Sequence, residues 1–223
     1  MRKEARQAFV TTGILAAVYV LFTLLVRFVD VRQIGPEGSS VGFAGLNGAV
    51  FRLFGGFHQG FYTVSKLLGY LLLLLAVCVA LLAVFQLIQK KSLRGVNWDL
   101  KLYILYGVLV LAVYVFTSKV SINSRPVITD AAEGLEKSYP SSHTLLAVCV
   151  AGALLAQIQL RIREDTLRRI LTIAAWVLAG VTVLARLLAG VHWLTDIIGG
   201  VLLGLVLVGL YRAMIKLKYR KFR

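Results

Sequence analysis

The chain has few charged residues and few cysteines, and each scarcity excludes a class of protein. Charged residues make up 16% of its 223 residues, whereas a soluble domain carries about a quarter. These charges lie in short blocks between long apolar stretches, so no soluble domain is expected. Cys78 and Cys149 both fall inside apolar stretches and belong to no cluster with metal-ligand spacing. We expect them to pack as small hydrophobic side chains, and we expect no metal site.

Long hydrophobic stretches dominate the rest of the sequence. Hydrophobic residues make up 59% of the chain, and the mean hydropathy is +0.82. Several stretches approach or exceed the roughly 17–25 residues that a helix needs to cross a bilayer. We place six spans near residues 8–29, 61–88, 100–118, 144–160, 170–190 and 194–214. The predicted fold is all-α, a bundle of six transmembrane helices that forms one integral membrane domain over residues 1–223.

Lysine and arginine are unevenly divided between the two sides that six spans define. Both termini fall on one side, which holds about twice as many of these residues as the other. The positive-inside rule therefore places both termini in the cytoplasm. This topology, together with attraction to anionic headgroups, accounts for the net charge of +15, so nucleic acid is not expected as a partner. The first span is longer than a signal peptide's apolar region and lacks a small-residue cleavage site, so we expect an uncleaved anchor.

The first outer connection, residues 30–60, is rich in glycine and leaves two interpretations open. Apolar residues recur there at spacings of three and four: Phe43, Leu46, Val50 and Phe54. Residues 42–54 could therefore form an interfacial helix, or a loop that packs on the bundle. In the last span, Gly200 and Gly204 indicate close helix contact through small residues. That contact could lie within one chain or between copies, so the oligomeric state is not predicted.

Ionisable side chains lie at the outward ends of the predicted spans. Lys119 ends the third span and His143 begins the fourth. Arg186 lies near the end of the fifth span, and His192 opens the sixth. Alternating topology places all four at the same membrane face, beside Arg125 of the second outer connection. Ionisable residues inside a span usually face the bundle interior and have a function, which applies best to Arg186.

Each of these residues also has a purely structural explanation. A lysine such as Lys119 at a helix end often only extends toward the interface. His192 and Asp196, four residues apart on one helix face, could form an ordinary hydrogen bond. Ser142 and His143 at the start of an apolar stretch could be a helix cap. The combination at one face is harder to explain in this way than any single member.

The cationic part of this cluster suits a phosphate. The transition state of phosphoryl transfer spreads negative charge over three equatorial oxygens. Lys119, Arg125 and Arg186 could match that charge, and arginine can bind phosphate oxygens in a bidentate manner. Backbone N–H groups of Ser141 and Ser142 would add the anion affinity of a helix N-terminus.

The two histidines suit covalent catalysis on that phosphate. His192 could attack phosphorus with a neutral ring nitrogen while Asp196 holds the other ring N–H and fixes the tautomer. The departing alkoxide is a poor leaving group, so a protonated histidine opposite the nucleophile would help. His143 is the histidine placed to supply that proton.

Three motifs in this region resemble the signature motifs of the type 2 phosphatidic acid phosphatase superfamily. They are Lys119 with Arg125-Pro126, Pro140-Ser141-Ser142-His143, and Arg186 with His192 and Asp196. The resemblance implies metal-independent and cofactor-independent dephosphorylation of a membrane lipid in a bacterial plasma membrane, at an active site on the outer face. It also implies a phosphohistidine on His192, oriented by Asp196, with His143 as the acid. Lys119, Arg125, Ser141, Ser142 and Arg186 would bind the phosphate.

The sequence departs from the family pattern at three positions. Five residues separate Lys119 from Arg125, where the family usually has six, so the family register would place the lysine at Ser118. Ser142 replaces the usual glycine, and Ala185 replaces the serine that usually precedes the arginine of the third motif. The nucleophile, the acid and the orienting residue are all retained, so an active enzyme is expected.

Other outer residues have no assigned role in the sequence. Those between the first two motifs are expected as a solvated surface or as part of the access route for a headgroup: Asp130, Glu133, Glu136 and Lys137. His58 is not expected to be catalytic, because it lies far from the motifs in sequence. Lys66 is a weak candidate for binding a second phosphate or a headgroup.

Three functional hypotheses follow from the sequence. The first is a lipid phosphatase, and the second is a lipid phosphotransferase that uses the same phosphohistidine. The third is a transporter or scaffold without catalysis, which is disfavoured because transporter sites usually lie near the bilayer midplane between repeats. Phosphatidylglycerol phosphate, undecaprenyl diphosphate and phosphatidic acid all carry a terminal phosphate, so the sequence does not identify the substrate.

Overall fold

Helices account for nearly all of the regular structure. The computed structural model describes residues 3–132 and 134–219, and within these ranges it contains seven α-helices and a two-stranded sheet. Six helices are long and apolar enough to cross a membrane: α1 (Lys3–Phe28), α3 (Gln59–Lys90), α4 (Trp98–Lys119), α5 (Ser142–Arg161), α6 (Asp165–Leu188) and α7 (Leu194–Lys218). This arrangement confirms the all-α class and the expected number of helices able to cross a membrane.

The helices extend beyond the predicted spans, because hydropathy detects only their apolar part. The largest differences are at two starts: α1 begins at Lys3 and not at 8, and α6 begins at Asp165 and not at 170. The first turn of α6 is polar and is capped by Glu164, whose carboxylate accepts from the backbone N–H groups of Thr166 and Leu167. Helices α3 and α7 likewise continue through lysines at their C-terminal ends. The basic residues Arg2, Arg220, Lys221 and Arg223 lie outside the described part of the chain.

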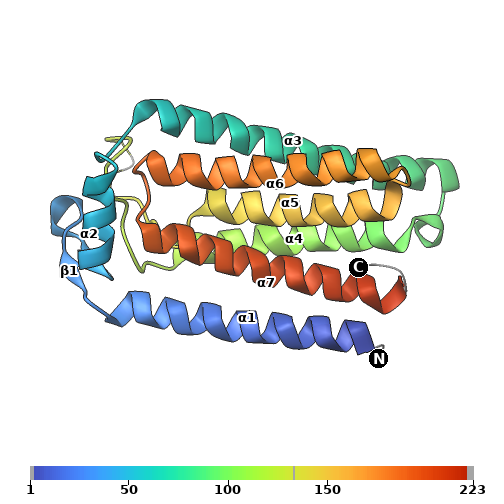
Figure 1. Ribbon diagram of the computed structural model, residues 1–223, viewed down its shortest axis with the longest axis horizontal. Helices are drawn as coiled ribbons and strands as arrows, with labels where there is room; N and C mark the ends of the chain where they lie inside the picture. Colours follow the sequence, from blue (N-terminus) through green and yellow to red (C-terminus); the bar gives the residue numbers. More distant parts are fainter. Residues whose placement is uncertain (1–2, 133, 220–223) are drawn as a thin grey trace.

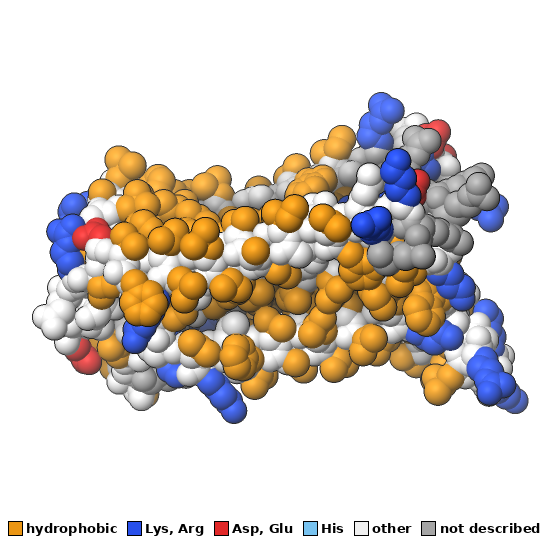
Figure 2. Space-filling model, turned by 90° about the horizontal axis from the view of Figure 1, so that it is seen from below, with side chains coloured by type: hydrophobic (Ala, Val, Ile, Leu, Met, Phe, Trp, Pro, Cys, Tyr) orange, Lys and Arg blue, Asp and Glu red, His pale blue; other side chains and the backbone are white. Residues whose placement is uncertain are grey.

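The six long helices run side by side as one bundle (Figure 1). Helices α5 and α7 are the most buried of the six, and α1 and α3 are the least. Helix α1 lies along α7, while α3 packs against α5 and α6. Hydrophobic side chains cover the length of the face in Figure 2, and lysine and arginine gather toward its two ends. This distribution is typical of a bundle that faces lipid along its middle.

The glycines of α7 make contacts within the chain. A Cβ at Gly199 would come within 2.6 Å of the Tyr139 ring, and one at Gly200 would come within 2.8 Å of the Ser141 carbonyl. A Cβ at Gly204 would lie 2.7 Å from Val148. The close contacts predicted for this span therefore join α7 to α5 and to the segment before it, and the oligomeric state stays open.

The first outer connection contains a helix and a small hairpin. Helix α2 (Ala44–Leu53) lies across the end of the bundle, and β1 (Arg32–Gln33) pairs with β2 (Ser40–Val41) in an antiparallel manner (Figure 1). Phe51 of α2 packs on Trp193, with ring centroids 5.5 Å apart. Of the two interpretations left open for residues 42–54, the chain forms the helix. Helix α2 also packs on the bundle, beside the turn that carries His192.

The two termini lie at the end of the bundle opposite to α2 (Figure 1). A buried polar network joins three segments at this end. Asp99 of α4 forms an ion pair with Arg161 of α5, and its Oδ1 accepts from the Tyr219 hydroxyl at 2.7 Å. Gln157 links Arg161 to the Tyr211 hydroxyl of α7. This network holds the helix ends together far from the predicted site.

Candidate active site

Three segments meet at the end of the bundle that carries α2. They are the connection 120–141, the start of α5, and the turn 189–193 between α6 and α7. The turn depends on Gly190, which has a φ of 65° and approaches the Gly56 carbonyl so closely that a Cβ would lie 2.1 Å from its oxygen. A side chain at position 190 would therefore push the turn away from the first outer connection. This packing fixes the position of His192, two residues later.

His192 is buried and presents one ring nitrogen without a partner. Its imidazole is 4% exposed, and its Nδ1 lies 3.1 Å from the Ser138 hydroxyl. Its Nε2 has no hydrogen-bond partner among the described residues. Burial, and then the positive charges of Arg186 and Arg125, hold the pKa of His192 well below its ordinary value. The ring is therefore neutral at pH 7, as a nucleophile requires.

Asp196 lies near His192, but a hydroxyl stands between them. The distance from Asp196 Oδ2 to His192 Nδ1 is 3.8 Å, too long for a hydrogen bond. Instead, Oδ2 accepts from the Ser138 hydroxyl and from the Trp193 N–H at 2.9 Å, and Oδ1 accepts from the Asn123 amide at 3.0 Å. The direct hydrogen bond expected from the sequence is thus replaced by a contact through Ser138.

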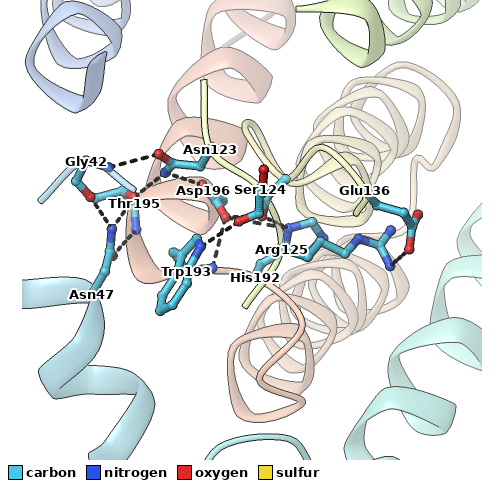
Figure 3. Close-up of polar contacts among 11 residues, drawn as sticks. Gly42, Asn47, Asn123, Ser124, Arg125, Glu136, His192, Trp193, Thr195 and Asp196 are labelled. Carbon is cyan, nitrogen blue, oxygen red and sulfur yellow. Dashed lines mark hydrogen bonds and ion pairs between the residues drawn. The ribbon is translucent and has the colours of Figure 1, made fainter. Parts of the chain in front are cut away.

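Asn123 and Thr195 connect this site to the first outer connection (Figure 3). Asn123 Oδ1 accepts from the Gly42 N–H at 3.0 Å, and Asn47 Nδ2 donates to the Gly42 carbonyl at 2.7 Å and to Thr195 Oγ1 at 2.9 Å. Asn47 and Asn123 are both 1% exposed. Because both buried amides find their partners in Gly42, Thr195 and Asp196, they tie α2, the connection 120–141 and α7 into one rigid support for Asp196.

Arg186 supplies a buried positive charge beside the histidines. Its side chain is 1% exposed, and its Nη1 donates to the Ser65 hydroxyl at 3.2 Å. Its guanidinium lies over the Tyr62 ring, 5.3 Å from the centroid. Its Nε has no hydrogen-bond partner in residues 3–132 and 134–219. A buried guanidinium held by neutral groups is well suited to bind an anion.

Arg125 is the second cation, and it is already paired. Its Nη1 lies 2.8 Å from Glu136 Oε2 (Figure 3). The same Nη1 donates to Thr129 Oγ1 at 3.2 Å. The backbone N–H of Arg125 also donates to the Glu136 carbonyl at 2.9 Å. Glu136, expected at a solvated surface or along an access route, is therefore a partner of a site residue. Its carboxylate holds the guanidinium in place and competes with a phosphate for it.

The start of α5 presents the serines of the second motif. The N–H of Ser141 donates to the Asp196 carbonyl at 2.9 Å, so it is not available to a phosphate as the sequence suggested. The buried Ser141 hydroxyl, by contrast, has no partner in the described part of the chain. Ser142 begins the helix, so its N–H and those of the next two residues have no partner within α5. The phosphate-binding elements here are one hydroxyl and the helix N-terminus.

His143 lies on the first turn of α5, within electrostatic range of His192, Arg186 and Arg125. Its ring packs against Gly69 of α3, where a Cβ would lie 3.1 Å from the ring. The structure thus brings both histidines and two of the three predicted cations together.

His143 also lines one end of a large apolar cavity between α3, α4 and α5. The cavity measures about 620 Å³ and, apart from Ser142 and His143, has a mostly apolar wall. From His143 it extends along α5 to Ala153, reaching Ala80 of α3 and Tyr103 of α4. Ten residues of helix cover about 15 Å, which is half of a bilayer core. The volume lies within the usual range for ligand pockets, about 300–1,000 Å³.

Lys119 is the predicted site residue that is not brought into this cluster. It ends α4 with an exposed side chain, and its backbone carbonyl accepts from the Lys137 ammonium at 2.6 Å. His58 is exposed, and its Nε2 lies 2.6 Å from the Phe54 carbonyl. Lys66 is half-buried above the Tyr62 ring, at 5.2 Å. Glu133 lies outside the described residues.

Sequence reasoning missed Ser138, Asn123, Ser65 and Tyr62. Asn123 lies inside the first motif and Ser138 lies two residues before the second, and only their closeness to Arg125 and Pro140 pointed to them. Ser65 and Tyr62 lie on α3, more than a hundred residues from Arg186. No local pattern distinguishes them from other polar residues near a helix end. Within the described ranges, no group of three or more His, Cys, Asp or Glu side chains is placed to hold a metal ion.

This fold and this cluster define a class of membrane protein. The sequence model of the PAP2 superfamily matches residues 100–220, more than half of the chain, and the protein belongs to this superfamily. Among solved structures, the chain resembles the first transmembrane PAP2-type phosphatidylglycerolphosphate phosphatase from Bacillus subtilis, with a TM-score of 0.63 at 19% identity. The similarity covers 95% of this chain and 98% of that one, so the two share a fold.

A second solved structure, LpxE from Aquifex aeolicus, is 24% identical over 78% of this chain and 96% of that one, with a TM-score of 0.44. A search of curated proteins found no match.

Proposed function

We propose that the protein removes a terminal phosphate from a membrane lipid phosphate or diphosphate through a phosphohistidine on His192. One observation carries this proposal: of the seven buried side-chain polar atoms without partners in the described residues, four belong to side chains around the two histidines. They are His192 Nε2, Arg186 Nε, Arg125 Nε and Ser141 Oγ, none of which has a hydrogen-bond partner among the described residues. A nucleophilic nitrogen, two guanidinium groups and a hydroxyl are the groups that phosphoryl transfer requires.

In the proposed reaction, Arg186, Arg125 and the N-terminus of α5 bind the phosphate oxygens. His192 Nε2 attacks phosphorus, and the bond from phosphorus to the lipid oxygen breaks. His143 gives its proton to that oxygen, and then takes a proton from the water that displaces the phosphoryl group from His192. Lys119 would reach a phosphate oxygen only if its exposed side chain turned toward the site, and we retain it as a proposal.

The apolar cavity supports a lipid as the substrate. It begins at Ser142 and His143, where the leaving oxygen would lie, so a chain attached to that oxygen can continue between α3, α4 and α5. A water-soluble phosphate ester has no part that would use this surface. The acid on the leaving group and the tail site are therefore neighbours, as hydrolysis of a lipid ester requires.

The proposed orientation follows from charge. The site lies at the end of the bundle opposite the termini (Figure 1), and the side of the termini carries most of the lysine and arginine. The positive-inside rule then supports an active site at the non-cytoplasmic face of a plasma membrane. Cysteine accessibility to an impermeant reagent, at Ser40→Cys in the exposed part of the first outer connection, would test this orientation in intact cells.

Phosphate release by the purified protein tests the proposal. The panel contains phosphatidylglycerol phosphate, undecaprenyl diphosphate and phosphatidic acid, with and without EDTA and vanadate. We expect release that survives EDTA, is inhibited by vanadate and is lost in His192→Ala, while the matched variant His58→Ala retains it. A labelled donor lipid shows whether water or a second lipid accepts the phosphoryl group. A normal rate in His192→Ala would contradict the mechanism.

A further inference from the structure

Ser138 is held in place from both sides of the site. Its backbone N–H donates to the Asn123 carbonyl at 2.9 Å. The ring of the next residue, Tyr139, packs against Gly199 of α7, and the Tyr139 hydroxyl lies 2.7 Å from Thr23 of α1. These contacts leave Ser138 2% exposed. The backbone around Ser138 is therefore fixed by α1, α7 and the opposite arm of its own connection.

The hydroxyl of Ser138 contacts both His192 and Asp196. It donates to Asp196 Oδ2 and lies 3.1 Å from His192 Nδ1, whereas those two atoms are 3.8 Å from each other. Asp196 also accepts from the Asn123 amide and the Trp193 N–H. Three donors favour the ionised carboxylate, which can only accept hydrogen bonds. The single proton of the Ser138 hydroxyl is thus used on Asp196, and its oxygen can only accept from His192.

We propose that Ser138 is a positioning residue that connects Asp196 to His192 and keeps the ring proton on Nδ1. This inference rests on the proposed function of His192 as the nucleophile. With the proton on Nδ1, the Nε2 atom has a lone pair, and Nε2 is the ring nitrogen without a partner in the described part of the chain. In the opposite arrangement, a protonated Asp196 would donate to the Ser138 oxygen and Ser138 would donate to Nδ1. The ring proton of His192 would then be on Nε2, the attacking atom.

The hydrogen-bonded chain from Asp196 through Ser138 to His192, here called the relay, also stabilises the phosphohistidine intermediate. When Nε2 forms its bond to phosphorus, the bond to the lipid oxygen breaks and that oxygen takes its proton from His143. The His192 ring becomes positively charged and keeps its Nδ1 proton, which the Ser138 oxygen accepts while its own proton stays on the Asp196 carboxylate. When water displaces the phosphoryl group, the electron pair of the nitrogen–phosphorus bond returns to Nε2.

Substitutions that remove or retain the hydroxyl test this role. We expect Ser138→Ala to lower kcat about 10- to 100-fold with KM unchanged, by analogy with the loss of a residue that orients a metal-binding histidine. Ser138→Thr, which keeps the hydroxyl, should recover most of the rate. Ser121→Ala, an exposed serine in the same connection, is the matched control and should behave as wild type. A kcat within twofold of wild type in Ser138→Ala, or equal losses in the alanine and threonine variants, would overturn the proposal.

The tautomer can be measured in the wild-type protein, with substitutions used only to assign its signals. The chain has three histidines, so ¹⁵N-histidine NMR of the full chain in detergent gives three rings, which His58→Gln and His143→Gln assign. We expect His192 to carry its proton on Nδ1 at pH 7.5, and a proton on Nε2 would overturn the relay even if Ser138→Ala folds poorly. If the wild type releases no phosphate from any lipid, the proposed function fails, and the spectrum still decides this inference.

Discussion

Replacing Arg186 with methionine should stabilise the protein while removing its activity. Burial of an ion costs several kcal/mol even after the protein relaxes around it. Arg186 is 1% exposed, and within the described ranges its guanidinium contacts the Ser65 hydroxyl and the Tyr62 ring. One hydrogen bond to a charged group returns about 1.5–3 kcal/mol, and a desolvated cation–π contact about 2 kcal/mol. Against a burial cost of about 6 kcal/mol, these contacts leave about 1–2.5 kcal/mol uncompensated, which Arg186→Met removes because methionine has no charge to bury.

Thermal unfolding and phosphate release in the same detergent measure the two effects. We expect the melting temperature of Arg186→Met to rise by about 2–4 °C for each kcal/mol gained. Its kcat/KM should fall at least 10²- to 10³-fold, the usual cost of removing one group that stabilises developing charge. Vanadate at 100 times its Kd should stabilise the wild type by about 2.7 kcal/mol and the variant far less.

Arg163→Met is the control for this comparison, because Arg163 is an exposed arginine in the short connection between α5 and α6. We expect it to leave activity and vanadate stabilisation as in the wild type. An Arg186→Met protein that unfolds below the wild-type temperature, or that keeps the full vanadate effect, would refute the view of Arg186 as a buried charge reserved for phosphate.

Three further predictions follow from the site. His143→Ala should lower kcat/KM, which reports the steps up to departure of the leaving group, about 10²- to 10⁴-fold on a lipid phosphate and much less on an aryl phosphate, whose leaving group needs no proton; equal losses of kcat/KM on both would exclude the acid role. Folding lowers the pKa of His192, so the unfolded chain binds a proton first as the pH falls below about 6.5. The melting temperature should therefore decrease from pH 7.5 to 5, and it should decrease less in His192→Gln. Gly107→Phe should fill the apolar cavity and raise KM for long-chain lipids but not for short ones. Gly180→Phe on α6, where a side chain also meets no close neighbour, should leave KM unchanged. Matching KM values in the two variants would contradict the tail site.

The sequence predicted the helices well because their composition alone requires them. An apolar stretch of this length has to satisfy its backbone hydrogen bonds internally in lipid, which leaves a helix as the available structure. The helix ends were less accurate, since polar turns such as the one at Asp165 extend a helix beyond its apolar part. The hairpin of β1 and β2 was not predicted, because strands of two residues have no detectable alternation.

The site was predictable where chemistry restricts the residue type, and less so elsewhere. An arginine such as Arg186 is costly to bury in a span, and the chain has only three histidines, so Arg186 and His192 both stand out in an apolar sequence. Ser138, by contrast, is an ordinary serine in an irregular connection, and its contact with Asp196 depends on how Tyr139 packs against α7. The pairing of Arg125 with Glu136 likewise depends on the path of the connection 120–141. Such contacts arise from tertiary structure that no local spacing encodes.

The central claim is that His192 Nε2 bonds to phosphorus, and trapping of the phosphoryl group tests it most directly. The protein is mixed with a lipid phosphate labelled on its terminal phosphate, quenched under conditions that preserve phosphohistidine, digested and analysed by mass spectrometry. We predict label on the peptide that contains His192, formed before phosphate is released and absent from His192→Ala. Label on His143, or phosphate release at full rate without any labelled histidine, would contradict the account.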